Sequence, residues 1–397
     1  MRARAILVCT FLLISAIAVG AATYQTIHSF SGYPDAGSPF AGVIFDQYGN
    51  LYGVAAWGEW NEGTIFQLTP SQSAWNFRVL HEFDLHDTEA AAPIGGLVMD
   101  EAGNLYGTGS YVHGPSDACS SVFKLSATGT FTILHFFPYT GEEGCDPETT
   151  LTYSSRWLWG TTKGGGSNGQ GTVFSMDTDG DSFQFSSFSG IKGREPLSAF
   201  SAWGYGTTYS GGWKGKGNIY RLDPAKGLIN KHGFTVDGKA GYAPRGDLLT
   251  LYVDGVRSIY GTTSAGGAGG GGAVYRLTEI EPNSDRWRTT VLHHFTSGSE
   301  EGWTPMAGLT GDAAGNLYGT TYSGGQDGRG CGTVFKLSPG KKANAEWNYI
   351  VLYSFDLNNG DGCNPMSGLI FDKAGNFYGT TMKGGEYYRG TVYQIIP

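Results

Sequence analysis

The stretch GNLYGTTYSGGQDGRGCGTVFKLSP, residues 315–339, recurs in altered form seven times along this chain. Each copy contains an aromatic residue followed by glycine, and successive pairs lie 46 to 60 residues apart. The pairs are Tyr52-Gly53, Tyr106-Gly107, Trp159-Gly160, Tyr205-Gly206, Tyr260-Gly261, Tyr318-Gly319 and Tyr378-Gly379. A repeat of this length is typical of solenoids and propellers, in which each unit buries its apolar face against its neighbours.

Each repeat holds four strand-like runs. In the sixth repeat they are residues 308–310, 317–321, 332–337 and 347–355, which alternate in polarity and are rich in β-branched and aromatic residues. The segment 312–316, DAAGN, predicts a tight turn between the first two runs. A proline precedes each first run and places the starts of the repeats near Pro39, Pro93, Pro147, Pro196, Pro244, Pro305 and Pro365. The sequence therefore predicts an all-β, seven-bladed β-propeller with four-stranded blades.

The two ends of the repeat region are complementary. Residues 24–30, YQTIHSF, resemble the fourth run of a repeat, whereas residues 390–397 form a third run with no fourth after it. We therefore expect residues 24–30 to supply the outermost strand of the last blade. Such closure removes the free sheet edges that promote aggregation.

The first 22 residues have the pattern of a secretory signal. Arg2 and Arg4 precede an uncharged apolar run over residues 5–19, and small residues follow at 20–22. A membrane anchor is the alternative, but the run is short for a span. We expect a secreted, periplasmic or cell-surface protein with residues 23–397 as one propeller domain. We also expect no membrane span in the mature protein, and a monomer.

Several motifs resemble those of the Gloeobacter/Verrucomicrobia (GloVer) tandem-repeat family. They are GNLYGTT at Gly315, GNLYGTG at Gly103, GNFYGTT at Gly375, GTVFKL at Gly332 and PMSGLIFD at Pro365. The resemblance implies an exported repeat protein, and it carries no catalytic motif that could be transferred to this chain. The turn and the aromatic strand also resemble those of NHL-type propellers. That likeness implies that the proline-led strand lines a central channel.

Four cysteines follow the signal-like segment. Cys119 and Cys331 lie between the second and third runs of repeats two and six, and Cys145 and Cys363 lie just before the next proline. In a propeller these two kinds of loop emerge on the same face, so repeat symmetry pairs Cys119 with Cys145 and Cys331 with Cys363. An exported protein can keep such disulfides. A shared zinc site would need all four thiolates together, yet the pairs are four repeats apart.

Two other recurring residues suggest chemistry but have simpler explanations. One slot in the fourth run is occupied by His28, His81, His135, His232 and His293. One per blade, they would be too far apart to share a metal, so we interpret them as packing residues. The turn aspartates Asp46, Asp100, Asp312 and Asp372 are explained by backbone hydrogen bonding in the turn. We expect neither a metal nor a cofactor.

The loops of one face hold the candidate binding residues, which are Trp57, Trp60, Trp213, Trp303, Tyr322, Tyr387 and Tyr388. Acidic residues on the same loops are Glu142, Glu143, Glu300, Glu301 and Asp361. These aromatics could stack on sugar rings or bind another protein, or they could only pack loop against loop.

Our hypothesis from the sequence is an exported binding module for a glycan or an extracellular protein. The acidic composition, with net charge −9, argues against nucleic acid as a partner. A polysaccharide-active enzyme, either hydrolase or lyase, is the alternative, and a hydrolase would need two carboxylates about 5–9.5 Å apart. A purely structural envelope protein is a further possibility.

Overall fold

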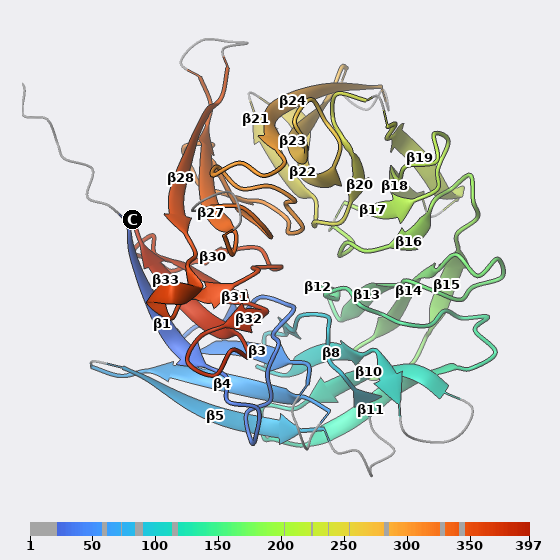
Figure 1. The fold of residues 1–397 in the computed structure, drawn as a ribbon. Helices are drawn as coiled ribbons and strands as arrows, with labels where there is room; N and C mark the ends of the chain where they lie inside the picture. The colour runs from blue at the N-terminus through green and yellow to red at the C-terminus, as the bar shows by residue number, and fades with distance from the viewer. Residues whose placement is uncertain are drawn as a thin grey trace, which may run out of the picture.

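Seven four-stranded antiparallel blades form a closed ring in this computed structural model (Figure 1). The structure describes residues 22–57, 62–72, 74–83, 90–112, 118–201, 203–223, 225–236, 238–253, 255–281, 286–325, 330–340 and 346–397. The predicted signal segment lies outside these residues except for Ala22. The prediction of an all-β, seven-bladed propeller is confirmed.

The first four blades follow one another along the chain. Blade one contains β2 (Ile44–Phe45), β3 (Leu51–Ala55), β4 (Thr64–Pro70) and β5 (Trp75–Glu82). Blade two contains β7 (Val98–Met99), β8 (Leu105–Gly109), β10 (Ala118–Leu125) and β11 (Phe131–Pro138). Blade three contains β12 (Thr152–Ser154), β13 (Trp157–Thr162), β14 (Thr172–Asp177) and β15 (Gln184–Ser187). Blade four contains β16 (Arg194–Pro196), β17 (Tyr205–Ser210), β18 (Asn218–Asp223) and β19 (Gly227–Gly233).

The last three blades complete the ring. Blade five contains β20 (Tyr242–Pro244), β22 (Val256–Ala265), β23 (Gly270–Glu279) and β24 (Trp287–Thr296), and β21 (Leu249–Val253) also pairs with β22. Blade six contains β25 (Thr310–Gly311), β26 (Leu317–Thr321), β27 (Thr333–Ser338) and β28 (Asn348–Ser354). Blade seven contains β30 (Ile370–Phe371), β31 (Phe377–Thr381), β33 (Thr391–Ile396) and β1 (Thr23–Ser29).

Short elements in the loops extend two of the blades. β6 (Ala90–Ala91) pairs with β9 (Tyr111–Val112), and β29 (Gly362–Cys363) pairs with β32 (Lys383–Gly384). A 3-10 turn, η2, spans Leu357–Asn359. No helix among the described residues is long and apolar enough to cross a membrane.

The ring closes through β1, as the sequence predicted. β1 runs antiparallel to β33, with Thr23 opposite Ile396 and Ser29 opposite Thr391, so the first described strand lies beside the C-terminus (Figure 1). The Tyr24 ring stacks on Tyr353 of blade six at 4.7 Å. The same strand therefore completes blade seven and packs that blade against its neighbour.

The repeated aspartates hold the turns between the first and second strands of their blades. The Asp312 carboxylate accepts hydrogen bonds from the backbone N–H groups of Ala314 and Asn316, the Asn316 amide at 2.7 Å and the Tyr318 hydroxyl at 3.0 Å. Burial by itself would raise the pKa of Asp312, but these hydrogen bonds outweigh it and lower the pKa. Asp46, Asp100 and Asp372 make equivalent sets. These contacts confirm the structural interpretation of the aspartates.

Neighbouring blades meet at a glycine and a proline. Gly332 has φ +101°, and a Cβ atom there would lie 2.1 Å from the Thr321 carbonyl oxygen and 2.9 Å from Pro365 Cδ of the next blade. The residue before that proline, Asn364, is left-handed with φ 60°, and its N–H donates to the Cys331 carbonyl at 2.7 Å. The same glycine-to-proline contact occurs at Gly63–Pro93, Gly171–Pro196, Gly217–Pro244, Gly272–Pro305 and Gly390–Pro39.

The fourth-strand histidines pack between blades, which confirms their structural interpretation. The His81 ring stacks on Phe131 of the next blade at 3.9 Å, and its edge contacts Phe83. His28, His135 and His293 stack in the same way on Phe77, Phe183 and Tyr349. His232 has Thr289 as its neighbour, with Nδ1 and the hydroxyl 3.2 Å apart.

Stability should fall below pH 6.5 because burial lowers the pKa of three of these histidines, His135, His232 and His293. Burial, with a smaller contribution from Lys214, lowers the pKa of His232 to about 4. The unfolded chain binds a proton near pH 6.5 while the native state does not, so protonation favours unfolding between pH 6.5 and about 4. Lowering the pH from 7.5 to 5 should reduce the free energy of unfolding of both the parent and His232→Asn. The reduction should be about 2 kcal/mol smaller for His232→Asn, which has no imidazole to protonate. Urea unfolding at both pH values measures this difference, and equal falls would contradict the assignment.

Both predicted disulfides are present. Cys119 is bonded to Cys145, which joins blade two to the loop entering blade three, and Cys331 is bonded to Cys363 between blades six and seven. These links also establish that the loops between second and third strands emerge on the same face as the loops entering each blade. We call this side the loop face and the opposite side, with the aspartate turns, the turn face. Two disulfides are compatible with an extracellular protein.

Candidate functional site at the mouth of the central channel

The segments that follow the seven prolines surround a central cavity of about 520 Å³. In each blade the residue directly after the proline lines this cavity, and the seven are Phe40, Ile94, Glu148, Leu197, Arg245, Met306 and Met366. Five of them are apolar, and the two charged residues come from blades three and five. This composition is that of a ligand site, in which a few polar groups interrupt an apolar wall.

Small residues and threonines let the innermost segments approach one another closely. A Cβ atom at Gly95 would lie 2.5 Å from the Thr149 carbonyl oxygen of the next blade, so only glycine fits there. The Thr108 hydroxyl of β8 donates to the Pro147 carbonyl at 2.8 Å. Equivalent bonds run from Thr262 to Ala307 and from Thr380 to Ala41. Each blade thus fixes the channel wall of the next one.

An aromatic pair lies on the blade-one side of the cavity. Trp57 is 44% exposed, lines the cavity and meets the Phe40 ring edge-to-face at 5.0 Å. Its backbone N–H donates to the Gly37 carbonyl at 3.2 Å, which anchors the loop after β3 to the loop entering blade one. The Trp57 ring is thus partly exposed to solvent while it packs against Phe40.

The charged groups of the cavity come from blades three and five. The Glu148 carboxylate is 3.0 Å from the Lys163 ammonium. Asp247 also lines the cavity and accepts a hydrogen bond from the Ala199 backbone N–H at 2.5 Å. The Asp247 side chain is exposed to the channel, but the crowded protein around it desolvates the carboxylate and raises its pKa. The channel therefore holds two carboxylates, one paired with a lysine and the other with a raised pKa.

Comparison with known proteins places this architecture in a family. The profile of the Gloeobacter/Verrucomicrobia repeat matches residues 13–204, 109–279 and 204–397. The chain belongs to the Gloeobacter/Verrucomicrobia repeat family. The resemblance stated from the repeat motifs is thus confirmed. No curated protein matches the chain.

Two solved structures similar to this Gloeobacter/Verrucomicrobia repeat protein come from Bacteroides. One is a proposed 6-phosphogluconolactonase of Bacteroides uniformis, with 14% identity over 84% of this chain and 95% of that one, at a TM-score of 0.47. The other is a proposed 6-phosphogluconolactonase of Bacteroides fragilis, with 16% identity over 88% and 97% of the two chains, at a TM-score of 0.49. Identities this low do not indicate a shared activity.

The aromatic residues named from the sequence do not form one cluster in this repeat protein. Trp57 stands at the channel mouth with Phe40, which sequence reasoning missed. Tyr387 and Tyr388 are exposed in the loop before β33, where the neighbouring Arg389 side chain packs on Gly37. That loop is therefore in the same sector as Trp57.

The other named aromatics lie elsewhere. Trp213 is exposed in the loop after β17 of blade four. Trp303 and Tyr322 are half-buried in blade six, where Trp303 packs against Gly271 and Gly324. Trp60 lies outside the described residues. The one signal that would have identified Phe40 is its place directly after a proline.

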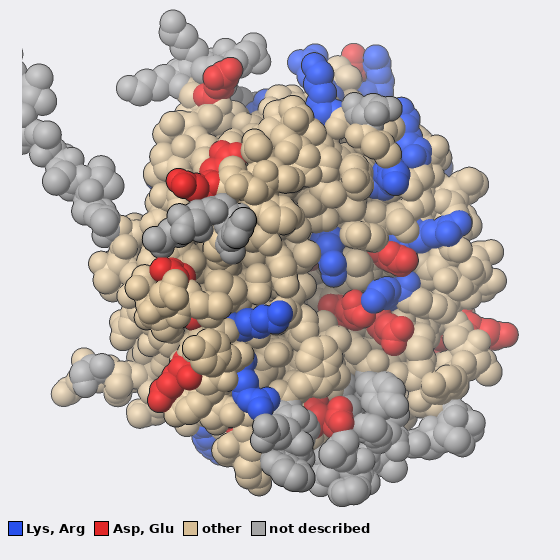
Figure 2. Space-filling model, viewed as in Figure 1, with Lys and Arg blue, Asp and Glu red and all other residues tan. Residues whose placement is uncertain are grey.

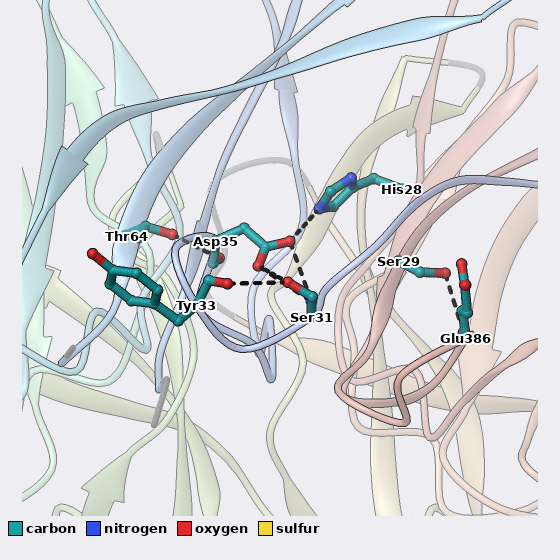
Figure 3. Close-up of polar contacts among 7 residues, drawn as sticks. All are labelled: His28, Ser29, Ser31, Tyr33, Asp35, Thr64 and Glu386. Carbon is teal, nitrogen blue, oxygen red and sulfur yellow. Dashed lines mark hydrogen bonds and ion pairs between the residues drawn. The ribbon is translucent and has the colours of Figure 1, made fainter. Parts of the chain in front are cut away.

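The acidic residues of the loop face are mostly engaged with the strand before them. Figure 3 shows the arrangement at blade one, where the Asp35 carboxylate is 2.9 Å from His28 Nε2 and accepts from the Ser31 hydroxyl at 2.7 Å. The Thr64 hydroxyl donates to the Asp35 carbonyl in the same view. Each such acid lies four residues before a blade-opening proline, a pattern that sequence reasoning missed.

The same contact recurs in other blades. Glu143 is 2.9 Å from His135, Glu301 is 3.4 Å from His293, and Asp361 accepts from the Tyr353 hydroxyl at 2.5 Å. Glu142 and Glu300 are exposed beside them. Since Glu143 and Glu301 are held at different blade junctions, they do not form the carboxylate pair of a glycosidase. No group of three His, Cys, Asp or Glu residues within the described part of the chain could hold a metal ion.

Proposed function

We propose that this protein is an exported binding module that holds a glycan chain at the mouth of its central channel. The observation that supports this most strongly is the exposed Trp57 beside Phe40 at the rim of the cavity. An indole ring that packs against Phe40 and is 44% exposed offers a platform with little conformational entropy to lose on binding.

The surroundings of the cavity favour a ring structure with apolar faces and polar substituents over a compact ion. Ile94, Leu197, Met306 and Met366 offer apolar contact, while Glu148 and Arg245 offer hydrogen bonds at two positions. Most of the face in Figure 2 carries no charged side chain. A sugar, with apolar ring surfaces and a rim of hydroxyl groups, matches this mixture.

Binding of oligosaccharides should depend on Trp57. We expect Trp57→Ala to weaken the binding of a glycan ligand at least tenfold, because about 1.4 kcal/mol is a modest part of what a stacked aromatic contributes. Glycan arrays identify the ligand, and isothermal titration calorimetry then measures the dissociation constants.

Trp203→Ala is the matched control. Trp203 is 50% exposed and lies next to Tyr252 in the turn before β17, on the turn face. Its loss should leave glycan affinity unchanged. If the array shows no ligand, or if both variants bind alike, the channel-mouth proposal is wrong.

A catalytic role is the second candidate, and one observation favours it. The acids named from the sequence do not converge, but Asp247 and Glu148 both line the channel, and the pKa of Asp247 is raised by burial. A carboxyl with a raised pKa can act as a general acid. Release of reducing ends from a polysaccharide by the parent, and its loss in Asp247→Asn, would favour a glycoside hydrolase over a binding module.

A further inference from the structure

The positive charge of this protein is concentrated in blades four and five. Residues 189–299 carry 13 of the 26 Lys and Arg residues but only 8 of the 35 Asp and Glu residues. Figure 2 shows Lys and Arg side chains gathered over these blades, at the upper right. The remainder of the chain is correspondingly acidic. A protein of net charge −9 thus has one cationic sector.

Six of these cations lie in the loop-face segments of blades four and five, and together we call them the cationic patch: Lys192, Arg194, Lys214, Lys216, Lys239 and Arg245. They come from the loop entering blade four, the β17–β18 loop, and the segment leading to and just past Pro244. Within the described part of the chain, none of the six forms an ion pair with an acid. Glu195 is the one acid described in these three segments, and Asp247 lies two residues beyond Arg245 on the channel wall.

Contacts between the segments make the patch continuous. The Arg194 side chain packs on Gly211, where a Cβ atom would meet Arg194 Cγ at 2.9 Å. The Lys216 ammonium lies 5.3 Å above the ring of Tyr242, three residues before Arg245. These contacts carry the patch from the entrance of blade four to the channel wall.

Aromatic rings position two of the cations without neutralising them. Tyr242 lies under Lys216, and the Arg245 guanidinium lies 5.6 Å above the Tyr209 ring. Such contacts orient a cation but leave its N–H groups available to an anion. Charges left unpaired on one sector raise the local concentration of anionic partners and speed their association.

Trp213 adds a second kind of contact. It is 65% exposed and lies next to Lys214 in the segment GGWKGKG, residues 211–217. Four glycines in this segment keep side-chain bulk low around the indole. An exposed aromatic ring followed by two lysines suits a partner that carries both a flat apolar ring surface and a negative charge, as a uronic acid residue does.

We infer that the glycan bound by this protein is a polyanionic polysaccharide, whose carboxylates or sulfates bind the cationic patch. This inference rests on the proposed function, since Arg245 joins the patch to the channel mouth where Trp57 lies. A chain of sugars lying across the loop face contacts the patch on one side of the cavity and the Trp57–Phe40 pair on the other.

The test compares two ligands that differ only in charge, a galacturonic acid oligomer and its fully methyl-esterified form. We expect the parent to bind the acid at least tenfold more tightly than the ester at 20 mM salt. This preference should shrink at 500 mM salt because the Debye length falls to a few ångströms. Lys214→Gln combined with Lys216→Gln should weaken binding of the acid about tenfold and leave ester binding unchanged.

The control variant removes the same charge from the turn face. Lys226 and Lys373 are exposed in turns on that side, so Lys226→Gln combined with Lys373→Gln should bind both ligands like the parent. If the two double variants lose affinity equally, a general charge effect accounts for the binding and the patch does not. Tighter binding of a single-stranded DNA of equal charge would overturn the assignment to polysaccharide.

Other outcomes separate this inference from the proposed function. If Trp57→Ala weakens both ligands while the patch variant changes neither, the channel mouth is the site and the patch inference is wrong. If the patch variant weakens the acid while Trp57→Ala changes neither ligand, the patch stands and the channel-mouth proposal fails. Self-association that the patch variant abolishes, without acid binding by the parent, would identify a second copy as the occupant and overturn the inference.

Discussion

Removing residues 22–30 is expected to unfold the ring. The deletion takes away β1 and leaves the full length of β33 as an exposed edge. It also removes Tyr24, which packs against Tyr353, Phe355 and Tyr393, and Phe30, which is fully buried. Loss of a buried aromatic side chain costs about 3–5 kcal/mol, and loss of the half-buried Tyr24 and of the β1 hydrogen bonds adds to this. That sum approaches the whole stability of an ordinary domain.

The measurement is a thermal melt by circular dichroism together with size-exclusion chromatography. We expect the deleted protein to have no cooperative transition near that of the parent and to aggregate through the open edge. A melting temperature within a few degrees of the parent would show that β1 is dispensable and that the ring does not depend on this closure.

A circular permutant provides the control for the deletion. Thr23 lies opposite Ile396, so a short turn that joins Pro397 to Ala22 converts β33 and β1 into a hairpin. The permutant keeps every residue of the closure but changes its connection. It should melt close to the parent, which would assign the loss in the deletion to the missing strand.

Gly332→Ala is expected to cost about 3 kcal/mol or more of the free energy of unfolding. Its φ of +101° is unfavourable for any residue with a side chain, which costs about 1–3 kcal/mol. The new methyl group would also lie 2.1 Å from the Thr321 carbonyl oxygen and 2.9 Å from Pro365 Cδ. Both neighbours are held in place, one by its strand and the other by its ring. Relief therefore requires the loop after β26 to shift within blade six and blades six and seven to move apart.

Urea denaturation of Gly332→Ala and Gly375→Ala distinguishes the cost of a positive φ from the cost of a steric clash by the added methyl group. Gly375 has φ +87° in the turn of blade seven, and a Cβ atom there would meet nothing within 4 Å. Gly375→Ala should therefore lower the free energy of unfolding by only about 1 kcal/mol, the cost of placing alanine at a positive φ. Equal losses in the two variants would contradict the role of the glycine-to-proline contact between blades.

Most of the architecture could be predicted from the sequence because its causes are local. The segments around Asp312 and Asp372 form turns because the aspartate carboxylate accepts hydrogen bonds from the backbone N–H and the side-chain amide of the asparagine four residues later. The alternation in residues 317–321 and 332–337 gives strands, and seven such units require a ring. Repetition also made the disulfide pairing predictable. It made the position of β1 predictable too, because only the last repeat lacked a fourth strand.

The candidate site was predicted less well because its parts come from different blades. The exposed aromatics were found by type, but only the folded ring shows that Trp57 meets Phe40 and that Trp303 is packed between loops. Acids that suggested catalysis proved to be partners of the preceding strand, as with Glu143 and His135. Such contacts depend on loop paths that carry no strong turn signal.

What the sequence by itself determined is the number, order and closure of the blades, because these follow from a pattern that each repeat expresses within its own 46 to 60 residues. What only the tertiary structure decided is which side chains share the channel and the loop face. The residue after each proline reaches the axis because Gly332 and its equivalents let successive blades meet within van der Waals contact. The spacing between successive blades depends on contacts between two repeats, so the sequence of a single repeat does not specify it.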